Sequence, residues 1–193
     1  MNAEIVITGS GGQGVLLIGR LLAEASFLEG REVVWLPSYG AEKRGGTVSC
    51  SVTISDEKIG ALFISKPGAA IAMNQAASGK LETAMKPGGM LVINQSLVTT
   101  KVSREDIHAV YVPAYRLALE LGNESVANLI ILGALVAGFP VVSRSAIMKI
   151  LETTFARNQK ALEMNKRAFT LGYQFCEGKT PGLSETPGAP QQS

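Results

Sequence analysis

The segment that says most about this chain reads Ile5-Val6-Ile7-Thr8-Gly9-Ser10-Gly11-Gly12-Gln13-Gly14. Its apolar half predicts a buried strand that the glycines end, and residues 14–28 then carry the apolar pattern of a helix. A strand, a glycine loop and a helix N-terminus in this order can hold an anion on free backbone N–H groups and the positive end of the helix dipole. Glycine suits such a loop because it permits positive φ and puts no Cβ between backbone and ligand. We therefore expect a phosphate or pyrophosphate at this loop.

The spacing Gly9-x-Gly11-x-x-Gly14 also fits the fingerprint of dinucleotide-binding domains. A nicotinamide-binding domain needs an acidic residue at the end of its second strand, where it holds the ribose hydroxyls. Here the second predicted strand, residues 32–36, is followed by Pro37 and Ser38, and Glu32 stands at its opposite end. NAD(P), another phosphate-bearing ligand and a tight turn that binds nothing all stay open. Gln13 could either donate to an anion or lock the loop.

A second loop strengthens the case for a binding site. Residues 42–46 follow the second strand, so in a parallel sheet they lie at the same carboxyl edge as residues 9–14. Arg44 could hold a carboxylate or phosphate through two parallel hydrogen bonds, or it could pair with Glu42. Tyr39 could stack on an adenine ring or a partner, or simply pack. Asn74, at the end of a later strand on this edge, is a further candidate contact.

The remaining pattern alternates strands with helices. We expect strands over 4–8, 32–36, 47–54, 69–73, 90–94 and 108–112, with an antiparallel partner strand at 59–64. Helices are expected over 14–28, 76–86, 114–122, 125–138, 143–155 and 157–175, with a short one started by the capping box at residues 103–106. This order predicts an α/β fold, a three-layer Rossmann-like sandwich whose mostly parallel sheet has an antiparallel insertion and whose C-terminal part is helical. Residues 1–176 should form a single domain and residues 177–193, with four of the eight prolines, a disordered tail.

Composition excludes several classes of function. The net charge of +2 is not gathered in any basic run, so nucleic acid is not an expected partner. Two cysteines without a Cys-x-x-Cys pair argue against a disulfide framework, a zinc site and an iron–sulfur cluster. The longest apolar run, residues 126–139, is shorter than the roughly 20 residues that cross a bilayer, so it predicts a buried helix and no membrane partner. The N-terminus lacks the basic region of a signal peptide, and we expect a cytoplasmic protein.

Other single residues favour structural roles. Cys50 lies on the apolar face of the alternating strand 47–54, which predicts a buried thiol. His108, the one histidine, starts a strand without visible catalytic partners. With 46% hydrophobic and 18% charged residues, the chain is apolar enough that we expect partner subunits to cover part of its surface.

Taken together, the two loops resemble a known signature. Residues 9–14 and the segment Ser38-Tyr39-Gly40-Ala41-Glu42-Lys43-Arg44-Gly45-Gly46-Thr47 look like the gamma subunit of 2-oxoacid:ferredoxin oxidoreductases, within the pyruvate/2-ketoacid ferredoxin oxidoreductase family. Family-like segments continue at residues 54–56, 72–75, 86–89 and 128–135, so the resemblance runs from about residue 4 to 175. The second loop looks closest to the 2-oxoglutarate or branched-chain 2-oxoacid subgroup, although Lys43 stands where methionine is expected.

The resemblance implies an oxidoreductase that converts a 2-oxoacid, with 2-oxoglutarate favoured, and coenzyme A to acyl-CoA and carbon dioxide while two electrons pass to ferredoxin. Thiamine diphosphate, Mg and iron–sulfur clusters would reside in alpha, beta and ferredoxin-like delta subunits. This chain would hold no tightly bound cofactor, metal or catalytic residue, would be inactive when isolated, and would support assembly and coenzyme A binding. The alternatives are a free-standing NAD(P)- or nucleotide-binding Rossmann-like enzyme and loops that mainly dock on the alpha subunit. The residues expected to contact coenzyme A are Gly9, Ser10, Gly11, Gly12, Gln13, Gly14, Tyr39, Gly40, Arg44, Gly45, Gly46 and Asn74.

Overall fold

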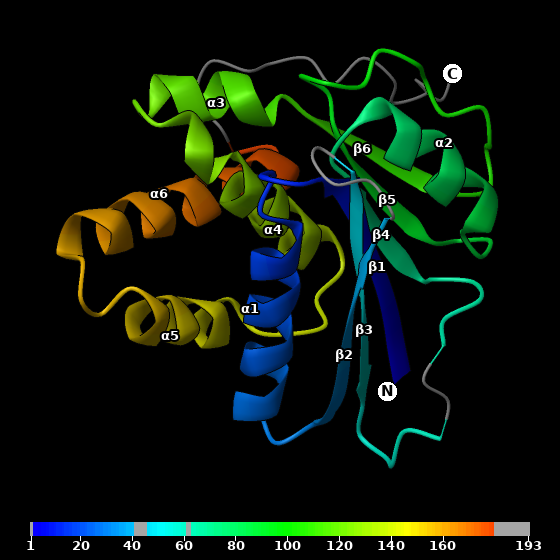
Figure 1. The fold of residues 1–193 in the computed structure, drawn as a ribbon, viewed down its shortest axis with the longest axis horizontal. Coiled ribbons are helices and arrows are strands. Elements are labelled where there is room, and N and C mark those ends of the chain that lie inside the picture. The colour runs from blue at the N-terminus through cyan, green and yellow to red at the C-terminus, as the bar shows by residue number, and fades with distance from the viewer. Residues whose placement is uncertain (1, 41–45, 61–62, 180–193) are drawn as a thin grey trace.

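A six-stranded mixed sheet forms the centre of the molecule (Figure 1). The computed structural model describes residues 2–40, 46–60 and 63–179. Neighbouring strands follow the order β2-β3-β1-β4-β5-β6, and β3 alone runs antiparallel to its two neighbours, β1 and β2. The pairs β1–β4, β4–β5 and β5–β6 are parallel. The strands are β1 Asn2–Ser10, β2 Glu32–Tyr39, β3 Thr47–Ser55, β4 Ala69–Ala72, β5 Met90–Asn94 and β6 His108–Val112.

Helices cover both faces of this sheet, which confirms the α/β prediction with its antiparallel insertion. In Figure 1, α2 lies to the right of the sheet, and α1, α4, α5 and α6 lie to the left. The helices are α1 Val15–Leu28, α2 Gln75–Ala84, α3 Ala114–Glu120, the short 3-10 helix Glu124–Val126, α4 Ala127–Gly138, α5 Arg144–Thr154 and α6 Gln159–Cys176. Within the described part of the chain, no helix combines the length and the apolar character needed to cross a membrane.

Helix α4 fills the larger of the two cores. Its residues from Ala127 to Val136 are all buried, as the apolar run predicts. Small residues let α6 approach it closely, because a Cβ at Gly133 would overlap the backbone carbonyl of Phe169 and one at Gly172 that of Ile130. The close approach fixes α6 across the outer side of α4 and completes the helical layer on that face.

Two local predictions are wrong. The expected strand at 59–64 is absent, since residues 59–60 and 63–64 are not in a strand and 61–62 lie outside the described residues. The physical reason is that β1 and β2 already occupy both edges of β3. The expected helix at 103–106 is also absent. There the N–H and hydroxyl of Ser103 both donate to Glu82 Oε1, at 2.6 and 2.7 Å, so the cap residue is engaged with α2 instead.

Strand β2 extends further than its sequence indicates. It continues through Pro37 to Tyr39, because β2 lies at the edge of the sheet, where a missing N–H breaks no ladder hydrogen bond. At the other end of the chain, α6 ends at Cys176, one residue beyond the expected helix end, and residues 180–193 of the predicted tail lie outside the described residues.

Candidate functional site

The glycine loop joins β1 directly to α1. Gly12 and Gly14 adopt positive φ, at 89° and 74°, which only glycine tolerates easily. Gly14 is the N-cap residue of α1, and it offers no side chain to cap the helix. The first turn of α1 carries no acidic residue. The positive end of the helix dipole therefore meets the loop without a neutralising carboxylate in that first turn, which is the electrostatic setting that favours an anion.

The side chain of Gln13 locks the loop. Its Oε1 accepts a hydrogen bond from the Ser10 N–H at 2.7 Å, and its Nε2 donates to the Met73 carbonyl at 3.3 Å. Of the two roles left open by the sequence, the structure shows this one. Gln13 thus ties the end of β1 to the end of β4 and holds the loop in a fixed shape.

The four glycines divide into two kinds. A Cβ at Gly9 would lie 2.6 Å from Gln13 Oε1 and 2.7 Å from Met73 Cβ, and a Cβ at Gly14 would overlap the side-chain amide of Asn128. At those two positions packing is by itself enough to require glycine, and at Gly14 the positive φ adds to it. Gly11 and Gly12 are exposed, and a Cβ at either would meet nothing within 4 Å. The open part of the loop, where a ligand has room, is therefore centred on Gly11 and Gly12.

The second loop meets the first at this edge. The N–H of Gly11 donates to the Gly46 carbonyl at 3.2 Å. Tyr39 lies in the same cross-strand row as Gly9, with Val48 of β3 between them. Two strand spacings separate Tyr39 from Gly9, about 10 Å, and the Tyr39 side chain is largely exposed. Gly40 closes the strand pair by donating to Thr47 at 2.7 Å. Arg44 and Gly45, both predicted site residues, lie outside the described residues.

Asparagines at the ends of neighbouring strands complete the edge. Asn74 donates through Nδ2 to Ser10 Oγ at 2.8 Å, and its Oδ1 accepts from the Ala77 N–H at 2.9 Å and so caps α2. Sequence reasoning missed Asn94, which ends β5, is fully buried and donates to the Met73 carbonyl at 3.3 Å. Its signal was available, because Asn94 ends a buried apolar strand just as Asn74 follows one.

Two residues with reactive side chains stand out in the sequence, Cys50 and His108. The Cys50 thiol donates to the Val15 carbonyl at 3.6 Å beneath the start of α1, and burial raises the pKa of this thiol to about 11. It is therefore protonated and unreactive near neutral pH. His108 is the first residue of β6. It therefore lies at the amino ends of the parallel strands, opposite the carboxyl ends that carry the glycine loop. No group of three or more His, Cys, Asp or Glu side chains within the described ranges is arranged to hold a metal ion.

The sheet order also bears on dinucleotide binding. Because β3 stands between β1 and β2, the end of β2 lies two strands away from the glycine loop. That end carries Ser38 and Tyr39 and no carboxylate. The acidic residue that would hold ribose hydroxyls beside the loop in a nicotinamide-binding domain has no counterpart at this position.

Comparison with known sequences gives a family match over most of the chain. The family model described as "Pyruvate ferredoxin/flavodoxin oxidoreductase" matches residues 4–175. "Ketoisovalerate oxidoreductase subunit VorA" of Methanothermobacter thermautotrophicus is 34% identical over 182 residues, which cover 94% of this chain but only 38% of that protein. "2-oxoglutarate synthase subunit KorC" of Methanocaldococcus jannaschii is 34% identical over 177 residues, covering 90% of this chain and 94% of that protein.

Two solved structures have the same fold. The gamma subunit of the keto/oxoacid ferredoxin oxidoreductase of Geobacter sulfurreducens superposes with a TM-score of 0.77 at 34% identity, covering 91% of this chain and 99% of that one. The 2-oxoglutarate:ferredoxin oxidoreductase of Magnetococcus marinus, solved with 2-oxoglutarate, coenzyme A and succinyl-CoA bound, gives a TM-score of 0.84 at 25% identity. This chain covers 33% of that longer polypeptide.

Proposed function

This chain belongs to the pyruvate ferredoxin/flavodoxin oxidoreductase family, with relatives of the gamma-subunit type, and on that premise we propose that it is the gamma subunit of a 2-oxoacid:ferredoxin oxidoreductase. The complex converts a 2-oxoacid and coenzyme A to acyl-CoA and carbon dioxide and passes two electrons to ferredoxin. The chain itself is not catalytic. It supports assembly, and its glycine loop helps to receive coenzyme A.

We assign 2-oxoglutarate as the substrate. The support is the extent of the match, because the relative named as a 2-oxoglutarate synthase subunit is covered over 94% of its length. The relative named as a ketoisovalerate oxidoreductase subunit is equally similar, but the chain spans only 38% of it. Gamma subunits named for pyruvate and ketoisovalerate are also covered over most of their length, but at 29% and 28% identity. The 34% identical 2-oxoglutarate synthase subunit is therefore the better guide to the complex in which this chain works.

The observation that carries the coenzyme A assignment is the open start of α1. Gly11 and Gly12 leave room above the uncapped helix, and the described residues place no carboxylate in its first turn. Coenzyme A is rich in phosphates, which suit this positive end. Tyr39, exposed in the row of Gly9, offers an aromatic face for the adenine ring. Arg44 and Gly45 extend the proposed site through the second loop, together with Gly40, Gly46 and Asn74.

We assign the remaining chemistry to partner subunits. Alpha and beta subunits hold thiamine diphosphate and Mg, which supply the decarboxylation, and a ferredoxin-like delta subunit carries iron–sulfur clusters to the external ferredoxin. The residues of this chain bind and orient the coenzyme A phosphates, and Gln13 keeps the loop rigid while they do so. Both cysteines are free thiols, which suits a reducing cytoplasm.

Calorimetric titration of the purified complex tests the assignment. We expect coenzyme A to bind and NADH to give no saturable heat, whereas tight NADH binding would favour the free-standing nucleotide enzyme instead. Arg44→Ala then separates ligand contact from scaffolding in the intact complex. A raised KM for coenzyme A supports the proposed site, and loosened assembly with an unchanged KM contradicts it.

A further inference from the structure

Strand β2 is an edge strand of the sheet. Its one strand partner is β3, and its other backbone edge pairs with no described residue. The edge strand carries the apolar run Val33-Val34-Trp35-Leu36, all half-buried. Natural proteins usually blunt such an edge with charged residues, proline or a covering element. In β2 the proline, Pro37, follows the apolar run, so residues 33–36 keep their N–H groups, and an apolar edge of this kind is a template for pairing with another chain.

The backbone groups that face outward can be identified. Gly40 donates to Thr47 of β3, so even-numbered residues of β2 point their peptide groups toward β3 and odd-numbered ones point away. Val33 and Trp35 therefore present N–H and carbonyl groups to the outside. Pro37, also odd-numbered, presents only a carbonyl because it has no N–H. The stretch able to form a full outward ladder is centred on Val34.

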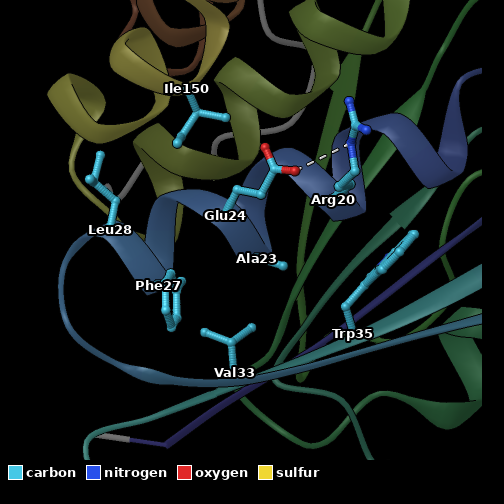
Figure 2. A pocket seen from close by; sticks show the side chains of 8 residues that line it. All are labelled: Arg20, Ala23, Glu24, Phe27, Leu28, Val33, Trp35 and Ile150. Atoms are coloured by element: carbon cyan, nitrogen blue, oxygen red, sulfur yellow. Dashed lines mark ion pairs between the residues drawn. The ribbon is translucent and has the colours of Figure 1, made fainter. Parts of the chain in front are cut away.

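An apolar groove runs beside this edge. The cavity, about 720 Å³, is lined by α1, β2 and Ile150 of α5, and Figure 2 shows Val33 and Trp35 of β2 facing Ala23 and Phe27 of α1 across it. Phe27 is 76% exposed, which is unusual for so large an apolar side chain. Apolar surface thus continues from the strand edge onto the helix above it.

The charges on the groove suit a second copy of the same surface. Arg20 and Glu24 lie one turn apart on α1 with Nε and Oε1 3.6 Å apart (Figure 2). A two-fold axis near the level of Ala23 brings Arg20 of one copy opposite Glu24 of the other, and the reverse. Because α1 packs over β2 and β3, the two α1 helices would lie roughly 10–14 Å apart on either side of the two-fold axis. Arg20 and Glu24 are long enough to meet across this separation.

We propose that two copies of this chain associate through β2, as an antiparallel pair around a two-fold axis at Val34, to form one continuous twelve-stranded sheet, twice the six strands of one copy. Val33 pairs with Trp35 of the other copy and Trp35 with its Val33, which gives four backbone hydrogen bonds. A register centred on Trp35 also allows four, but it leaves each Val33–Pro37 pair with one hydrogen bond because Pro37 has no N–H. A register centred on Val33 extends the ladder to Arg31, which lies outside the strand and whose N–H already donates to the Ser26 carbonyl. The grooves then face each other and bury Phe27, and the same patch serves both copies, as a two-fold interface requires.

Sedimentation of the full chain over a concentration series tests the association. We expect a species of twice 20.3 kDa. Arg20→Glu should raise the dimer dissociation constant roughly tenfold, and the double swap Arg20→Glu with Glu24→Arg should restore it. Phe27→Asp, at a solvent-exposed position, should give monomers with unchanged circular dichroism. A monomeric wild type at all concentrations, or a dimer unaffected by Arg20→Glu and Phe27→Asp, overturns the proposal.

Cross-linking tests the register. The axis at Val34 places the two Val34 residues opposite each other with Cα atoms about 4.5 Å apart, a separation that a disulfide spans. In a Cys176→Ser background, Val34→Cys should cross-link under mild oxidation. Leu36→Cys, on the same face of β2 but opposite Glu32 in this register, should not. Equal cross-linking of both variants, or of neither in a dimer, contradicts the register.

Discussion

Placing a carboxylate at Gly11 perturbs the proposed anion site with little risk to the fold. A Cβ at this position meets nothing within 4 Å, and its φ lies outside the positive range. The Gly11→Asp side chain would stand at the N-terminus of α1, where an acidic group is itself stabilised by about 0.3–1 kcal/mol. We therefore expect the variant to fold and to assemble as the wild type does.

The expected effect follows from the distance between two like charges. A carboxylate about 5 Å from a phosphate charge is opposed by about 0.8 kcal/mol in water and about 3 kcal/mol at an effective dielectric constant of 20. The exposed loop lies toward the aqueous limit, so we expect about 1–2 kcal/mol. At about 1.4 kcal/mol per factor of ten, the KM for coenzyme A should rise about 5- to 30-fold.

The assay is 2-oxoglutarate-dependent reduction of ferredoxin by the purified complex, with coenzyme A varied. The kcat and the KM for 2-oxoglutarate should stay unchanged, and the loss should shrink as salt screens the charges. Gly60→Asp is the matched control, since Gly60 is also exposed and open, but follows β3 at the opposite edge of the sheet. An unchanged KM for coenzyme A in a correctly assembled Gly11→Asp complex would refute the reasoning.

Three further outcomes are expected. Gly14→Ala should lower stability by about 1–3 kcal/mol, since its φ of 74° is strained for alanine and the new methyl overlaps Asn128; thermal unfolding measures the loss. In the native chain Cys50 should resist alkylation at pH 8, because its pKa is raised to about 11, so intact mass should show no more than one modified thiol until the protein unfolds. Burial by itself would raise the pKa of Glu82. The hydrogen bonds that its carboxylate accepts from Ser103 and Arg104 outweigh burial, so the pKa of Glu82 is lowered. Stability from Glu82 is thus present above about pH 4.5 and lost as pH falls through the lowered pKa, and Glu82→Gln should flatten acid unfolding curves in that window.

The repeating pattern of the chain was enough to predict most of the fold. Buried parallel strands such as β4 and β5 are short apolar runs, and their bounds follow from where polar or glycine residues interrupt them. The errors arise where the outcome depends on distant partners. The sequence of residues 59–64 cannot show that β3 has no free edge. The cap signal at Ser103 cannot show that Glu82, 21 positions earlier, accepts hydrogen bonds from both of its donors.

The candidate site divides in the same way. The order of the strands predicts that the glycine loop lies close to the second loop. In the structure the Gly11 N–H donates a hydrogen bond to the Gly46 carbonyl and so joins the two. The role of Gln13 could not be fixed from sequence, because its second partner is the carbonyl of Met73, 60 positions away. Asn94, which shares that carbonyl, becomes visible only when the ends of β4 and β5 are seen together.

The most direct test of the central claim is to recover the tagged chain from its own cells under native conditions, identify its partners by mass spectrometry and assay the recovered material. The account predicts a complex with thiamine-dependent partner subunits that reduces ferredoxin when both a 2-oxoacid and coenzyme A are supplied. Recovery of the chain as a lone species that turns over NAD(P)H would contradict it.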